Sequence, residues 1–308
     1  MSTEMSAVHT APVWFQWSVF PLVMGAAVYL SWVLMQTGMD PALAIFGPQL
    51  GGIALVALAE RLYPYHQSWL RSHDDIRVDV AHTLTLGVSS SFVNPAVISG
   101  GVLVAAWLSV QFNGSLWPVQ WALGLQIILA LLIGELPGYW MHRLQHSWDG
   151  MWRFHSVHHS APRLYWLNAG RFHVVDLMAT YVPTYLLLAV VGCPGEVIAF
   201  FGLISAVHGI FQHSNLQLRL GPLNWFFSMA ELHRWHHSRT VEEANTNFGQ
   251  TVSVWDWVFG TRFLPADREP PRDIGIADMP NFPMTWWAQV MAPFRWRRVK
   301  EEASGSVS

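Results

Sequence analysis

Long apolar runs mark most of the first two thirds of the chain, and all except the last contain no charged residue. A helix needs about 20 such residues to cross a bilayer. The runs occupy residues 13–35, 41–59, 84–112, 121–133 and 174–207. A Gly-Cys-Pro-Gly segment at 192–195 interrupts the last run, and this turn signal predicts two spans within it. We therefore expect an all-α integral membrane protein with about four to six transmembrane or re-entrant helices.

The run at 84–112 is the hardest to interpret, because it contains Pro95 and the pair Gly100 and Gly101. It predicts either one kinked span or a re-entrant segment followed by a span. No positively charged residue precedes the first run, which indicates a retained helix and not a cleaved signal peptide.

The segment after the apolar runs has a different character. Residues 265–283 are rich in Pro and Asp and read as a loop, and residues 284–298 are aromatic and then basic. The latter suit either a short interfacial helix on an anionic cytoplasmic leaflet or a helix that packs on the rest of the protein. From Glu301 onward we expect disorder.

The positions of the basic residues predict the orientation. All 17 lysines and arginines fall in three segments, at 61–77, 143–171 and 219–300. Cytoplasmic loops of membrane proteins are enriched in these residues, so we expect the three segments and both termini on the cytoplasmic side. The number of crossings agrees with this only if residues 79–112 cross the membrane once.

The amino-acid composition excludes several classes of protein. Charged residues make up 12% of the chain and apolar residues 52%, whereas soluble domains have about 25% charged residues. A net charge of −3 gives neither the high net charge of a disordered chain nor the basic surplus of a nucleic-acid-binding protein. Cys193 is the single cysteine, which excludes an intrachain disulfide framework.

Histidine is abundant, and its spacing indicates a metal site. Eleven of the 15 histidines lie between residues 142 and 237. The first pair is four residues apart, which places both rings on one helix face, and two later clusters share the pattern HxxHH. The eight histidines of these three clusters are His142, His146, His155, His158, His159, His233, His236 and His237.

Eight clustered imidazoles favour two metal ions. A neutral imidazole suits Zn, Cu, Fe and Ni, but eight are too many for one four-coordinate structural zinc ion. They are enough for two metals that keep open positions. His213, near the end of the last apolar run, is a ninth candidate ligand.

Three sequence blocks follow one another in the second half of the chain. They are ELPGYWMHRLQH at 135–146, WRFHSVHHS at 152–160, and a third that begins with LGPLNW at 220–225. The third block continues with HRWHH at 233–237, NTNFG at 245–249 and WDWVFGT at 255–261. In this order the blocks resemble the fatty acid hydroxylase superfamily, which includes sterol desaturases, alkylglycerol monooxygenase and bacterial lipid hydroxylases. The resemblance covers roughly residues 120–265.

The resemblance implies a membrane enzyme with two Fe ions that uses O2 to hydroxylate, or to desaturate, a membrane lipid such as a sterol or a fatty acyl chain. It implies that the iron ligands are His142, His146, His155, His158, His159, His213, His233, His236 and His237, with no catalytic residue beyond the metal site. Reducing equivalents would come from a separate ferredoxin, cytochrome or reductase. We expect membrane helices and a cytoplasmic loop at 1–118, a catalytic domain with a histidine-rich cytoplasmic cap at 119–265, and a Pro-rich loop, interfacial segment and disordered tail at 266–308.

Further residues are candidates for additional ligands or for positioning the ligands. His208 lies five residues before His213, so the two would not share a face of a straight helix. His173 and Asp176 would form a carboxylate–histidine pair that orients a ligand. Asp176 and Glu135 lie at the ends of apolar spans, where an ionisable group indicates a functional site or a helix-end partner. Asn247 lies in the third block.

Two other functions compete with lipid oxidation. A membrane transporter or binding protein for a metal or haem would also carry many histidines, but it predicts them along the bilayer midplane, and most lie outside the apolar runs. A non-catalytic relative would keep the fold without the chemistry, and the full set of clustered histidines argues against it.

Overall fold

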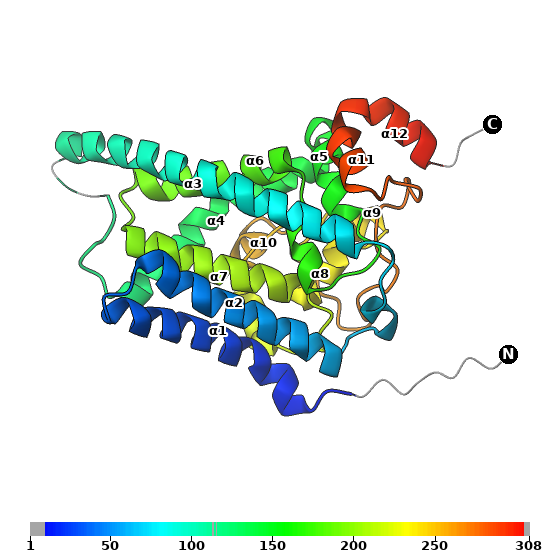
Figure 1. Cartoon of the computed structure of the whole chain (residues 1–308), viewed down its shortest axis with the longest axis horizontal. Coiled ribbons are helices and arrows are strands. Elements are labelled where there is room, and N and C mark those ends of the chain that lie inside the picture. The colour runs from blue at the N-terminus through cyan, green and yellow to red at the C-terminus, as the bar shows by residue number, and fades with distance from the viewer. Residues whose placement is uncertain (1–9, 113, 115, 305–308) are drawn as a thin grey trace.

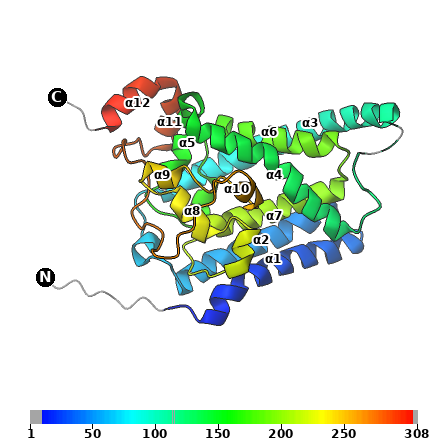
Figure 2. The ribbon, with the colours of Figure 1, turned by 180° about the vertical axis from the view of Figure 1, so that it is seen from behind.

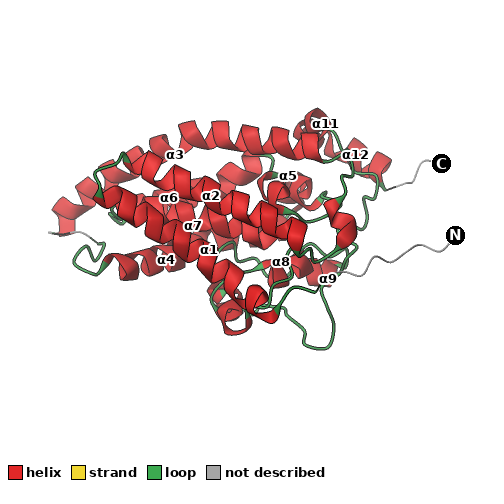
Figure 3. Cartoon of the chain, turned by 60° about the horizontal axis from the view of Figure 1, so that its bottom comes forward, coloured by secondary structure: helices red, strands yellow, loops and turns green. Residues whose placement is uncertain are grey.

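The computed structural model describes residues 10–112, 114 and 116–304. Within this part of the chain the regular elements are helices, as expected, and Figure 3 shows helices and loops only. The long helices are α1 (Val13–Gln36), α2 (Pro41–Leu62), α3 (Ile76–Phe112), α4 (Leu123–Ser147), α6 (Val174–Val190) and α7 (Gly195–His213). The shorter α-helices are α5 (Asp149–His159), α8 (Ala230–His236), α9 (Val241–Ala244), α10 (Val254–Val258), α11 (Trp286–Met291) and α12 (Trp296–Ala303). Single 3-10 turns are η1 (Gln67–Leu70), η2 (Trp166–Gly170), η3 (Gly221–Trp225) and η4 (Ala292–Arg295).

Five of the long helices, all except α6, are long and apolar enough to cross a membrane. This confirms the predicted number of spans and fits a multi-pass membrane protein. The turn predicted at 192–195 separates α6 from α7. The run at 84–112 forms one continuous helix that passes through Pro95 and both glycines.

The helix α3 is longer than a bilayer requires. Its 37 residues extend about 55 Å at 1.5 Å per residue, against a hydrocarbon core of about 30 Å. It begins eight residues before the predicted apolar run, and these first turns hold the buried Asp79 and His82. The amino-terminal end of α3 therefore reaches into the part of the molecule where the short helices gather.

The bundle is centred on α7. More than half of the most apolar window of α7 is buried (56%), compared with 6% for α3. The core lies between α1, α2, α4 and α7, where residues such as Phe20, Val56, Leu131 and Phe200 pack together. By contrast, α3 exposes apolar side chains such as Phe92 along its length. We infer that α3 faces lipid over most of its span.

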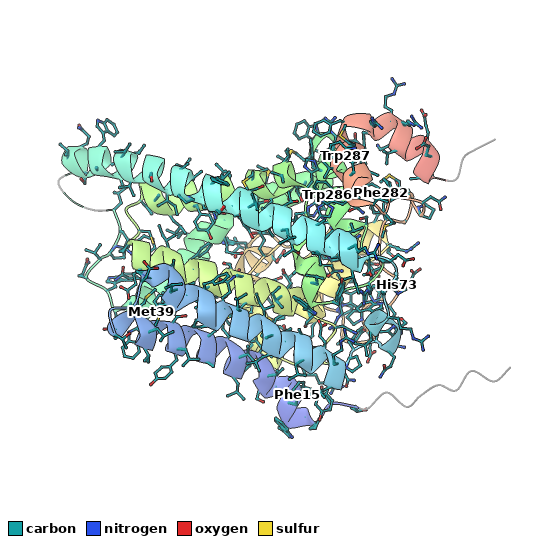
Figure 4. All side chains as sticks on the ribbon, viewed as in Figure 1. Phe15, Met39, His73, Phe282, Trp286 and Trp287 are labelled. Carbon is teal, nitrogen blue, oxygen red and sulfur yellow. The ribbon has the colours of Figure 1, made fainter. Side chains whose placement is uncertain are left out.

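Short helices cover one end of this bundle (Figures 1 and 2). The helices α5, α8, α9, α11 and α12 lie at the end where α2 finishes and α3 begins. His73 and Phe282 lie at this end, whereas Met39, in the turn between α1 and α2, lies at the other (Figure 4). We call the end with the short helices the cap.

The carboxyl-terminal segment packs on the cap, which was one of the two interpretations of residues 284–298. Val299 and Trp296 of α12 join a buried cluster with Val157 of α5, while Trp287 and Phe294 remain exposed. The expected disorder from Glu301 onward is wrong for the first of these residues. The helix α12 continues through Ala303, which is buried against the same cluster. Residues 1–9 and 305–308, where both predicted cytoplasmic termini fall, lie outside the described residues.

A buried ion pair joins the start of α3 to the loop after α5. Arg163 Nε and Nη2 donate to the two carboxylate oxygens of Asp75, at 2.6 and 2.9 Å, and Arg163 Nη1 donates to the carbonyl of Trp69. Burial alone would raise the pKa of Asp75, but the hydrogen bond and charge of Arg163 outweigh it and hold this pKa below its usual value.

We expect this pair to make the protein sensitive to acid. A carboxyl whose pKa is lowered by folding stabilises the protein above its unfolded value, near 3.9, and this stability is lost as the pH falls through the folded pKa. Asp75→Asn should cost about 3 kcal/mol at neutral pH and should flatten the loss of thermal stability below about pH 4. The check is the unfolding temperature in detergent from neutral pH downward, with Asp74→Asn as the control at an exposed neighbour. If the unfolding temperature of Asp75→Asn fell with pH as steeply as that of the wild type, the pair of Asp75 and Arg163 would not be the cause of the acid sensitivity.

Candidate metal centre

The cap brings together histidines from four segments of the chain. The end of α4 supplies His142 and His146, α5 supplies three, the last residue of α7 is His213, and α8 with the residue after it supplies three more. As many as 53 residues (160–212) separate consecutive segments in sequence, so helix packing and not local spacing brings them together. All nine predicted ligands lie in this one region.

The nine histidines divide into two groups. Within each group the nearest ligand nitrogens all lie within 4.8 Å of one another. The first histidine group contains His142, His146, His155, His159 and His236. The second histidine group contains His158, His213, His233 and His237. Each HxxHH cluster therefore contributes to both groups.

The nitrogen separations fit metal coordination. The Nε2 atoms of His142 and His155 lie 3.1 Å apart, and those of His159 and His236 lie 3.2 Å apart. In the second group the Nε2 of His233 lies 2.9 Å from that of His213 and 3.0 Å from that of His237. Two nitrogens bound at about 2.1 Å to one ion, at right angles, would lie about 3.0 Å apart. The donor set therefore fits two metal ions.

The opposite ring nitrogen is fixed by an acceptor in six of the nine histidines. Carbonyl and carboxylate oxygens accept only, so a histidine Nδ1 beside one carries its proton and leaves Nε2 with a free lone pair. The Nδ1–H of His142, His236 and His158 donates to the carbonyls of Phe248, Thr246 and Arg171. The Nδ1–H of His155, His146 and His213 donates to the side-chain oxygens of Asp176, Asn245 and Asn168.

The surroundings of the clustered histidines favour their neutral form. The three histidines of α5, the two of α8 and His237 directly after it all have a pKa well below the usual value, and burial is the main cause. Neighbouring imidazoles lower these pKa values further, because two protonated rings would repel each other. A neutral imidazole has a lone pair for a metal. The buried Nε2 of His146 has no hydrogen-bond partner, so its lone pair is free to bind a metal.

Asp176 pairs with a different histidine from the one expected. Its carboxylate accepts from His155 Nδ1 at 3.0 Å and from Gln145 Nε2 at 2.5 Å. His173 does not reach it: its Nδ1 accepts from the amide of Val175 at the start of α6, and its Nε2–H donates to the carbonyl of Val290. The predicted pair of His173 and Asp176 is therefore wrong, although Asp176 does orient a histidine.

Glu135, Asn247 and His208 lie outside both groups. Glu135 Oε2 accepts from the amides of Thr251 and Gln250, at 2.9 and 3.2 Å, and so ties α4 to the loop before α10. Asn247, whose φ is +53°, donates to the carbonyl of Leu232 and so holds the same loop against α8. His208 packs against aromatic rings in the core and joins neither group.

Residues in the loop between α9 and α10, together with Asp256, hold the backbone beside the histidines in place. Asp256 accepts from the amides of Phe248 and Gly249, at 2.8 and 2.9 Å. A side chain at Gly249 would meet the carbonyl of Val252 at 2.3 Å, so this position requires glycine. Because Phe248 supplies the carbonyl that His142 donates to, these contacts set the orientation of a first-group ring.

The sequence analysis missed several residues that position the ligands. Asn168 and Asn245 accept from histidines, Gln145 holds Asp176, and the ring of Phe172 stacks on His158 with centroids 4.1 Å apart. Gln145 lies between two candidate ligands in sequence, which is a usable signal. The others are 14 to 99 residues from their histidines in sequence, and spacing does not reveal such pairs.

Two cavities reach the histidines. One has a volume of about 670 Å³ and is lined by His142, His155, His158, His213 and His233, together with residues of α2, α3, α6 and α7. We call it the bundle cavity. The other, of about 350 Å³, is lined by His146 and His159 on the cap side. The histidine groups are thus accessible from within the bundle and from the surface of the cap.

Comparison with known proteins gives the family. The fatty acid hydroxylase model matches residues 127–261. The chain is 36% identical to ornithine lipid hydroxylase OlsE of Rhizobium tropici over 254 residues, which cover 82% of this chain and 76% of the relative. No solved structure matches the chain.

More distant relatives are also lipid monooxygenases by name. The chain is 28% identical to alkylglycerol monooxygenase of Xenopus tropicalis over 199 residues, which is 64% of this chain and 44% of that protein. It is 28% identical to methylsterol monooxygenase 1-1 of Arabidopsis thaliana over 140 residues, which is 44% of this chain and 46% of that protein. The chain therefore spans less than half of these two relatives. The histidine motifs, the extent of the match and the identity to OlsE together show that this chain belongs to the fatty acid hydroxylase family.

Proposed function

We propose that this protein is a di-iron hydroxylase of a membrane lipid. One observation carries the proposal: two groups of histidines, all buried except the half-buried His146, have nitrogens about 3 Å apart, and members of both groups line a cavity that runs into a bundle of apolar helices. The names of the relatives support oxidation of a lipid and favour hydroxylation over desaturation.

The two groups would each hold one iron ion. The first histidine group offers five nitrogens and the second offers four, so each ion would keep room for a further ligand. Iron bound there would supply the activation of O2 and the oxidation of a C–H bond, which protein side chains alone do not perform. The neutral donor set also suits Zn, Cu and Ni, so metal analysis is part of the test.

The chain itself positions the ligands, excludes water and orients the lipid. Asp176 and Asn168 fix the rings of His155 and His213 through Nδ1. The bundle cavity would admit the lipid from the side, because Phe46 of α2 and Leu86 of α3 both line it and α3 makes its main contacts with α6. The apolar walls would keep bulk water from the reacting carbon.

The same proposal includes the class of the substrate lipid, the electron donor and the orientation of the protein in the membrane. The match to OlsE extends over most of both chains, which supports an amino-acid-containing lipid as the substrate. Electrons would come from a separate ferredoxin, cytochrome or reductase, with the cavity beside His146 and His159 as its route of approach. The basic residues would place the cap and the catalytic region at 119–265 on the cytoplasmic side.

No observation favours the alternative function, a membrane transporter or binding protein for a metal or haem. That function predicts histidines along the spans, whereas the nine histidines of the two groups gather in the cap. His208 is a buried histidine in the middle of α7, and it packs against Phe20 and Phe227 instead of lining the bundle cavity.

The test compares the lipids of cells that express the wild-type chain with those of cells that express a variant without His158. We expect one lipid class to gain the mass of one oxygen only with the wild-type chain. Fragmentation of that lipid would show which chain carries the hydroxyl group. A loss of two hydrogens instead would indicate desaturation, and no change in any lipid class would contradict lipid oxidation.

A further inference from the structure

A third cavity lies on the cap, away from the histidine groups. It has a volume of about 1050 Å³, and none of the nine histidines lines it. Its walls come from the start of α1, the segment after α2, the loop before η3, α8 and residues 264–272. We call it the arginine cavity. Because the ends of α1 and α2 border it, it lies at the level where these two spans would leave the membrane.

Positive charge is concentrated in the arginine cavity. The arginines that line it are Arg71, Arg219, Arg234, Arg268 and Arg272, and the acidic residues are Glu231 and Glu269. Five positive charges against two negative ones contrast with the net charge of −3 of the whole chain. A concave site with this excess attracts an anion.

The two carboxylates leave part of this charge unpaired. Glu231 accepts from the amide of Leu220 and the side chain of Asn224, and Glu269 lies 4.0 Å from Arg272. Arg268 forms an ion pair with Glu243, which does not line the cavity, at 2.6 Å. Within the part of the chain that the structure describes, Arg71 and Arg219 form no ion pair. Both are exposed at the cavity.

Two buried donors on α8 add a second observation. Arg234 is only 2% exposed; its Nη2 donates to the carbonyls of Ser214 and Leu216, and its guanidinium lies over the ring of Tyr65, but its Nε has no partner. Trp235 is 1% exposed, and its Nε1 also has no partner. Both residues line the cavity. Both nitrogens are closed to solvent in this structure, so an acceptor in the cavity would reach them only if the side chains shift. An unsatisfied buried donor is costly, and such a shift would relieve that cost.

We propose that the arginine cavity binds a phosphate group, either of free phosphate or a soluble phosphate ester, or of a phospholipid headgroup. The planar, forked donors of arginine match phosphate oxygens. The volume exceeds that of a single phosphate and is in the range of small-molecule sites, so the group would be carried by a larger molecule. The enclosed donors favour such a ligand over a flat protein surface.

Binding there would restrain the helix that supplies metal ligands. Arg234 and Trp235 lie between His233 and His236 on α8. A phosphate that accepts from these two residues would hold α8 in its present position. The proposal does not depend on the identity of the metal or of the oxidised lipid.

The experiment has two arms and uses the purified full-length chain. In the first arm, equilibrium dialysis measures the binding of radiolabelled inorganic phosphate in detergent. In the second, native mass spectrometry counts phosphatidylglycerol molecules retained from nanodiscs that also contain phosphatidylcholine. Arg71→Gln and Arg219→Gln each remove an exposed arginine of the cavity, so the fold is preserved. Arg297→Gln is the matched control, because Arg297 is exposed on α12 and lies outside the cavity.

We expect saturable binding that falls about tenfold in each cavity variant and stays unchanged in the control. Such binding in the first arm assigns free phosphate or a soluble ester, and such retention in the second arm assigns a headgroup. Absence of saturable binding in both arms would overturn the proposal. Binding that is as strong in both cavity variants as in the wild type, or equally weakened in the control, would overturn it as well.

Discussion

Replacing His158 by alanine is expected to lower the iron content from about two ions per chain to one or fewer, and to abolish lipid hydroxylation. His158 belongs to the second histidine group, and its ring is held by the carbonyl of Arg171 and stacks on Phe172. Alanine removes a ligand nitrogen that no neighbouring side chain replaces. Loss of a partner that only orients a ligand already costs about 10- to 100-fold in metal affinity or activity, so loss of the ligand itself should cost at least that much.

Two controls separate this effect from a general loss of histidine. His73→Ala changes an exposed histidine of the cap (Figure 4) that belongs to neither group. His208→Ala removes a fully buried imidazole outside both groups, so it tests whether burial alone matters. Both controls should keep two iron ions per chain. Iron content measured by mass spectrometry checks this, and a His158→Ala protein that retains both ions would show that the second histidine group is not a metal site.

Replacing Asp176 by alanine is expected to weaken metal binding by about 10- to 100-fold. Its carboxylate joins His155 of the first histidine group to Gln145 on α4. Without it, the proton on His155 Nδ1 has no acceptor and the ring is free to turn. Asp176→Asn keeps one oxygen that can accept from His155, so it should lose less affinity than Asp176→Ala.

Competition with a chelator measures this affinity directly. Asp149→Asn is the matched control, because Asp149 lies at the start of α5 and pairs with Lys300 at the surface of the cap. A purely structural role for Asp176 would lower the unfolding temperature without changing the metal affinity of the folded protein. Equal affinities in wild type and Asp176→Ala would therefore contradict the positioning role.

The spans were predictable because the bilayer imposes a simple requirement on sequence. The ends of the spans were not predictable in this way, because an uncharged run ends at the first charged residue even where the helix continues. The predicted start of the third span at residue 84 misses the first turns of α3, where Asp79 is buried in an ion pair with Arg171. Similarly, α4 continues past Glu135, because three backbone amides of one loop donate to its carboxylate.

The candidate ligands were also predictable, but their partition was not. Spacing indicates that His155, His158 and His159 share a helix, yet it does not say that His158 faces the second group while its neighbours face the first. That division depends on how α5 packs against α4, α7 and α8. The positioning residues show the same limit. Asp176 lies only three residues after His173 in sequence, yet it accepts from His155, which the packing of α5 against α6 brings to it.

We propose that the cap holds two iron ions. The most direct test is the metal content of the wild-type protein, purified after growth with iron and without added chelator, and measured by mass spectrometry against the protein concentration. We predict about two iron ions per chain. A chain that contains one ion or none, or that contains zinc at both sites and no iron, would contradict this account.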